Sequence, residues 1–225
     1  MLGLLLGGGS HGARWAGRGP VYFLGLDVGQ KRDPSALVVV ERSEVATGEV
    51  NRVTYERVRE VRQVVRWAEA MPLGLDFGEI VERVRAVAGW PELEGRCTVA
   101  VDATGVGAPV VEMLKRAGLG CAVTGVTITG GERAKQEGGE WRVPKRVLVQ
   151  RLLVMLEQGE LRVAGKMAGA DKLMAELAGM RVRGEKMEGV GAHDDLVMAL
   201  ALACWVGKGG ERRDIFGTKN IGIYW

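Results

Sequence analysis

Aspartates flank apolar segments at three separate places in the sequence. Asp27 and Asp102 each end a short apolar run, whereas Asp194 and Asp195 stand just before a longer one. An ionised carboxylate in apolar surroundings costs free energy unless a cation or a metal ion compensates its charge. Because three segments each carry such an acid at one end, we expect the acids to converge on bound divalent cations.

The donor atoms that the sequence offers favour a hard metal ion. The chain has two histidines, and its three cysteines form no CxxC pair, so zinc is a poor match. Carboxylate oxygens suit Mg²⁺ or Mn²⁺. Two such ions about 3.5–4 Å apart activate a water and stabilise the leaving oxygen in phosphodiester hydrolysis. Each acid taken alone can instead be a turn residue or a helix cap, and Asp194 suits the N-cap position of the segment that follows it.

The composition is that of a globular protein. Of 225 residues, 47% are hydrophobic and 26% are charged, which argues against disorder. No apolar run approaches the ~20 residues of a membrane-spanning helix, so no membrane partner is expected. The net charge of +3 permits a nucleic-acid partner without demanding one. The phosphate-binding P-loop motif of ATPase motors is missing, and Gly105-Val-Gly107 lacks the third glycine of a dinucleotide-binding loop.

The elements that must position the acids follow from the hydrophobic pattern. Residues 21–27, 36–41 and 49–61 are predicted to form three antiparallel strands joined by short turns. Beyond them, helices and strands alternate. The expected helices cover residues 77–88, 109–117, 144–158, 170–180 and 194–206, and the expected later strands cover residues 98–102, 122–128 and 161–163.

This order of elements predicts an α/β fold with a mixed sheet and helices on both faces. Residues 1–20 are rich in glycine and are expected to be a flexible leader, and residues 208–225 a loose tail. The stretch between them, residues 21–207, is predicted to be one domain.

Four segments of this domain resemble the nuclease domain of phage large terminase subunits. The pair formed by HDDLVMALALA and VDATGVG is the most specific part of the likeness. The segments are residues 23–40 (FLGLDVGQKRDPSALVVV), 99–114 (VAVDATGVGAPVVEML), 143–153 (VPKRVLVQRLL) and 193–205 (HDDLVMALALACW).

The resemblance implies a ribonuclease H-like fold with a mixed sheet of five strands or slightly more. It also implies a DNA endonuclease that cuts concatemeric double-stranded DNA during viral genome packaging in the host cytoplasm. The expected partners are a terminase motor, a small terminase and a portal protein. Because no motor motif occurs in the chain, translocation is not expected of it.

The same resemblance assigns roles to the acids. Asp27 is expected to bridge both ions, Asp102 to bind one, and the pair of Asp194 and Asp195 to bind the other. Asp195 lies one turn before Ala199, a small residue that lets the helix approach the sheet, so we favour it as the ligand. Asp194 is then a cap or a second ligand.

Basic residues near the expected site suggest a grip on the DNA backbone. The alternative is a solvated loop followed by a helix cap. Trp141 is a candidate to stack on a base, and His193 a candidate to order water or a phosphate. The residues of the expected grip are Arg133, Lys135, Arg142, Lys145 and Arg146.

Two other functions fit the same residues. A nuclease resembling a Holliday-junction resolvase would use the same fold and prefer four-way junctions. A non-catalytic DNA-packaging module would bind DNA without cutting it, but such a module gains nothing from acids gathered beside DNA.

Overall fold

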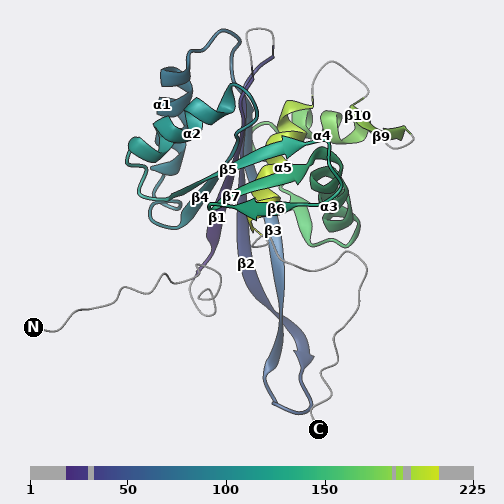
Figure 1. Cartoon of the computed structure of the whole chain (residues 1–225). Coiled ribbons are helices and arrows are strands. Elements are labelled where there is room, and N and C mark those ends of the chain that lie inside the picture. The colour runs from purple at the N-terminus through teal and green to yellow at the C-terminus, as the bar shows by residue number, and fades with distance from the viewer. Residues whose placement is uncertain (1–18, 30–32, 184–185, 190–193, 208–225) are drawn as a thin grey trace, which may run out of the picture.

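A mixed eight-stranded sheet forms the centre of the molecule (Figure 1). The computed structural model describes residues 19–29, 33–183, 186–189 and 194–207, so most of the predicted leader, the predicted tail and His193 lie outside the described residues. The strand order is β6-β7-β5-β4-β1-β2-β3-β8. The strands are β1 (Val21–Asp27), β2 (Ala36–Val50), β3 (Arg57–Ala70), β4 (Cys97–Asp102), β5 (Ala122–Thr129), β6 (Lys135–Glu137), β7 (Glu140–Pro144) and β8 (Leu161–Val163).

Helices cover both faces of this sheet, as the sequence predicts (Figure 1). On one face α1 (Phe77–Ala88) and α2 (Gly107–Arg116) enclose a core that contains Leu24, Leu26 and Val99. On the other face α3 (Lys145–Glu157), α4 (Ala170–Gly179) and α5 (Asp195–Gly207) enclose a second core. Because α5 is buried along almost its whole length, its apolar residues need no polar face.

The direction of the strands gathers four chain turns at one edge of the sheet. Strand β4 runs parallel to β1, β5 runs parallel to β4, and β7 runs parallel to β5. Their carboxyl ends therefore lie at the same edge, which we call the acid edge because Asp27 and Asp102 end β1 and β4 there.

The sheet is wider than the predicted five strands or slightly more. Residues 130–141, a polar and glycine-rich stretch that suits a loop or small hairpin, contain β6 and the start of β7, and β7 pairs with β5. At the far side β8 adds to β3. A separate two-stranded sheet, β9 (Met180–Arg183) and β10 (Lys186–Gly189), was not predicted.

The third predicted strand, residues 49–61, is wrong in its bounds. Strand β2 continues to Val50, and β3 begins only at Arg57. The reason is a turn at Asn51, whose side-chain Oδ1 accepts hydrogen bonds from the amides of Val53 and Thr54. The two strands extend beyond their neighbours as a long hairpin arm (Figure 1).

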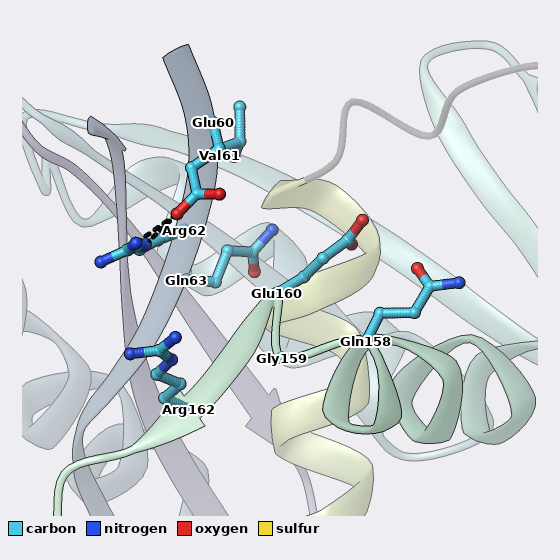
Figure 2. Close-up of a pocket in the computed structure, with 8 residues that line it drawn as sticks. All are labelled: Glu60, Val61, Arg62, Gln63, Gln158, Gly159, Glu160 and Arg162. Carbon is cyan, nitrogen blue, oxygen red and sulfur yellow. Dashed lines mark hydrogen bonds and ion pairs between the residues drawn. The ribbon is translucent and has the colours of Figure 1, made fainter. Parts of the chain in front are cut away.

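A hollow of about 320 Å³ lies beside β3 and β8, away from the acid edge (Figure 2). Gln63 lines it and pairs across the sheet with Arg42, which in turn pairs with Val21 at the opposite end of β1 from Asp27. Within the described residues no helix is long and apolar enough to span a membrane.

Candidate active site at the acid edge

The parallel pairing of β1 with β4 brings the first two predicted acids together. Leu26 of β1 pairs with Val101 of β4, so the next residues, Asp27 and Asp102, occupy neighbouring positions. The two strands that carry them are mostly buried, and both aspartates are partly exposed. The register of the sheet therefore places these two acids side by side, as the sequence predicts.

Helix α5 lies unusually close to β1, which places its first turn at the same edge. A methyl group built on Gly25 would lie 1.8 Å from the carbonyl oxygen of Ala199 and 2.9 Å from the amide nitrogen of Ala203. Only glycine at this strand position allows the helix backbone to approach so closely. The expectation that small residues let this helix reach the sheet is confirmed, and Asp195 stands one turn before the contact.

The electrostatics of Asp27 show that the four acids are neighbours. Loss of solvation raises the pKa of Asp27 well above its ordinary value. The negative charges of Asp102, Asp195 and Asp194, in that order, raise it further, and the ammonium group of Lys145 opposes them. Segments from three parts of the chain thus place mutually repelling carboxylates at one point.

Asp102 is held in place by the turn that follows its strand. Its Oδ1 accepts a hydrogen bond of 2.8 Å from the amide of Thr104, and the hydroxyl of Thr104 accepts one from the amide of Ile128. Desolvation raises the pKa of Asp102, while its hydrogen bonds with Thr104 and the charge of Lys145 lower it. A methyl group on Gly107 would lie 1.8 Å from the carbonyl oxygen of Asp102, so α2 begins tightly against this turn.

Lys145 is the basic residue that reaches the acids. It is the first residue of α3, directly after β7, and therefore starts at the acid edge. Its Nζ lies 2.6 Å from Oδ2 of Asp194. This ion pair offsets part of the repulsion among the carboxylates.

The cap of α5 comes from another helix and not from Asp194. The amides of Leu196 and Val197 donate hydrogen bonds of 2.9 and 3.3 Å to Oε2 of Glu176 in α4. Among the described residues, the side chain of Asp194 bonds instead to Lys145. The alternative that Asp194 serves as the cap of its own helix is therefore wrong.

The donor chemistry of the acid edge suits a hard divalent cation. All four side chains offer carboxylate oxygens, the donors that Mg²⁺ and Mn²⁺ prefer. Within the described residues, however, no three histidine, cysteine, aspartate or glutamate side chains lie close enough together to hold an ion as they stand. The charges of the acids affect one another, and Lys145 forms an ion pair with Asp194.

The other basic residues lie on the surface beside this edge. Arg133, Lys135, Arg142 and Arg146 are exposed, and Lys135 pairs directly with Arg142 across the β6–β7 hairpin. The ring of Trp141 packs edge-on against Trp205 at a centroid distance of 5.5 Å and is partly buried against the core around α5. Its stacking on a base stays a prediction.

Two residues of the site were missed from the sequence. Thr104 holds Asp102, and Glu176 caps α5. The signal for Glu176 is weak, namely an acid one turn after the buried Leu173 on the inner face of α4. Nothing local to that helix indicates that its partner begins 20 residues later.

The sheet order, the helices on both faces and the acids at the ends of β1 and β4 and at the start of α5 define a ribonuclease H-like fold. The structure is similar to that of the human cytomegalovirus terminase nuclease domain, a Mn-soaked structure, with a TM-score of 0.50. The match covers 83% of this chain and 84% of that one. Because the sequence identity is 9%, the match is evidence for the fold alone. No family model and no curated protein sequence matches the chain.

Proposed function

We propose that this chain is a metal-dependent DNA endonuclease of the viral large-terminase kind, which cuts double-stranded DNA during genome packaging. The observation that carries the proposal is the convergence of Asp27, Asp102 and the Asp194–Asp195 pair at one sheet edge, where burial and then their like charges raise the pKa of Asp27. Protein folding does not benefit from such repulsion. A site that binds divalent cations does, because the ions replace repulsion with attraction.

The proposed roles follow the predicted ones. Asp27 would contact both ions, Asp102 one of them, and Asp195, with or without Asp194, the other. When bound, two ions supply an activated water and stabilise the leaving oxygen of the phosphodiester. The chain itself fixes Asp102 through Thr104 and fixes the first turn of α5 through Glu176.

Lys145 has two proposed tasks. Without ions its ammonium group neutralises Asp194 at 2.6 Å. With a cation bound at Asp194, the ammonium group of Lys145 would be available to contact a DNA phosphate. Lys145 would thus belong both to the acid edge and to the predicted DNA-binding residues.

The proposed DNA path runs over the β6–β7 hairpin. Lys135 and Arg142 stand directly opposite each other on that hairpin. Like charges in such a cross-strand pair destabilise the hairpin unless a ligand neutralises them. A phosphate backbone provides that neutralisation, and Arg133 and Arg146 would extend the contact. We include in this proposal that the chain works with a terminase motor, a small terminase and a portal protein in the host cytoplasm.

Plasmid cleavage tests the proposal. Purified protein with Mn²⁺ is expected to convert supercoiled plasmid to nicked and linear forms with 5′-phosphate and 3′-hydroxyl ends, and EDTA should stop the reaction. Asp27→Asn and Asp102→Asn should each lower the rate by about 10²–10³-fold or more, the scale for removing one preorganised catalytic group. Glu60→Gln, the same chemical change at the hollow beside β3, serves as the matched control.

The other outcomes separate the alternative functions. Cleavage that survives both aspartate variants discards the assignment of the active site. A strong preference for four-way junctions over linear duplex would indicate a resolvase. Salt-dependent DNA binding without any metal-dependent cutting would indicate a packaging module.

A further inference from the structure

The first turn of α5 depends on a side chain from α4. The first four amides of any helix lack partners inside that helix. In α5 two of these amides, at Leu196 and Val197, donate to a single oxygen of Glu176. This helix therefore begins correctly only where α4 places that carboxylate.

The remainder of α5 is fixed by other contacts. Ala199 and Ala203 press on β1 at Gly25, and the residues from Leu196 onward are buried. Asp194 and Asp195 precede this packed region, at the end of the helix where fraying begins. The cap by Glu176 fixes the turn between the packed region and the two acids, and the ion pair of Asp194 with Lys145 adds to it.

The position of the Glu176 carboxylate is electrostatically unfavourable. Desolvation and the negative charge of Asp195 raise the pKa of Glu176, although the two amide hydrogen bonds lower it. Its second oxygen, Oε1, is buried and has no hydrogen-bond partner among the described residues. Serine, threonine or asparagine at the start of α5 would cap the helix without these costs.

We propose that Glu176 is a positioning residue of the active site, which fixes the first turn of α5 and thereby the directions of Asp194 and Asp195. The inference rests on the proposed metal-dependent function, because the two acids matter only if they bind ions. Side chains behind metal ligands commonly act in this way, and their loss lowers metal affinity about 10- to 100-fold.

Glu176→Ala and Glu176→Gln separate the cap from the charge. Glutamine keeps an oxygen that accepts from the two amides but removes the negative charge, whereas alanine removes both. Mn²⁺ binding to the full chain, measured by calorimetry, is expected to weaken about 10- to 100-fold in Glu176→Ala and to be largely retained in Glu176→Gln. Asp171→Ala is the matched control, because it removes an exposed carboxylate from the same helix.

Amide hydrogen exchange in the metal-free protein gives a second measurement. Exchange at Leu196 and Val197 should quicken in Glu176→Ala, while Glu176→Gln and Asp171→Ala stay near the wild type. This readout also shows that the alanine variant is folded, because core amides of β1 and β4 keep their protection.

Three results would contradict the positioning role of Glu176. Equal Mn²⁺ affinity in the wild type and Glu176→Ala overturns the positioning role while leaving the proposed nuclease function intact. Equal loss in the glutamine and alanine variants also overturns it, since charge and not capping would then matter. A wild-type protein that binds no Mn²⁺ overturns the nuclease proposal and this inference together, and the exchange data then report a cap with no role in metal binding.

Discussion

The two ends of the central sheet differ in the charge of the polar side chains that gather there. At the acid edge, Asp27 lies among three other carboxylates that raise its pKa, with Lys145 as the partner of Asp194. At the other end, the hollow of about 320 Å³ beside β3 holds the neutral, buried side chain of Gln63, and Glu60 forms an ion pair with Arg62 (Figure 2). The open space and the charge conflict thus occur in different places.

This difference indicates where chemistry takes place. The hollow beside β3 shows no comparable gathering of like charges, since Glu60 and Arg62 on its lining form an ion pair. Repulsion among partly buried acids, in contrast, lowers stability in the absence of a ligand, and a bound cation as proposed above would remove that cost. The charge conflict is therefore a better guide to the active site of this molecule than the cavity.

Divalent cations are expected to act on the acid edge alone, which is the strongest test of the comparison. At an ion concentration about 100 times the dissociation constant, binding adds about 2.7 kcal/mol of stability, or roughly 5–10 °C in melting temperature for a domain of this size. Thermal unfolding with and without Mn²⁺ or Mg²⁺ measures the shift. Asp27→Asn should remove most of it.

Glu60→Gln, at the hollow end, controls for this experiment. Its melting temperature should rise with Mn²⁺ as much as that of the wild type. If the ions stabilise the Asp27→Asn variant and the wild type equally, the ions bind elsewhere and the comparison between the two ends fails.

Much of the fold could be predicted because its helices and strands have clear local sequence patterns. The helix at Phe77–Ala88 shows a clear helical spacing of apolar residues, and its capping acid Asp76 and Glu79 form reciprocal hydrogen bonds. Strands β1 and β4 are short apolar runs that end in aspartate. Their parallel pairing is part of the ribonuclease H-like fold that the resemblance implies, and it places Asp27 beside Asp102.

The features that were missed depend on contacts between distant residues. Lys145 and Asp194 are 49 positions apart, and only the parallel course of β7 brings them to one edge. Trp141 lies in a polar stretch, yet its ring joins the core because β7 adds to the sheet beside β5. Residue type and spacing do not reveal which strand a short polar hairpin will join.

Removing one charge from the acid edge should stabilise the metal-free protein, a smaller effect than ion binding. The folded-state pKa of Asp27 is raised above its ordinary value of 3.8, so the native state binds this proton more tightly than the unfolded chain does. The associated stability is present at low pH and is lost as pH rises from about 3.8 through the raised value. At pH 7–8 in EDTA, Asp27→Asn should therefore unfold at higher urea than the wild type.

The gain should appear as a higher urea midpoint at pH 7–8, because the variant carries no charge among the other acids. The difference between variant and wild type should shrink as the pH is lowered toward 4. Asp171→Asn, which changes an exposed acid, should show no such trend. A constant difference at every pH would mean that packing, and not the charge of Asp27, separates the two proteins.

The smallest expected effect concerns the basic residues of the β6–β7 hairpin. Lys135 and Arg142 occupy directly opposite positions on the hairpin, whereas Arg62 at the hollow end is already paired with Glu60. Each phosphate contact that is removed should lower the slope of log affinity against log salt by about 0.9. Duplex binding in EDTA, measured by fluorescence anisotropy at several salt concentrations, should show this change for Lys135→Ala and for Arg142→Ala, and not for Arg62→Ala. Equal slopes for all three variants would place the DNA away from this hairpin, and the acid edge would then have to receive DNA from another side.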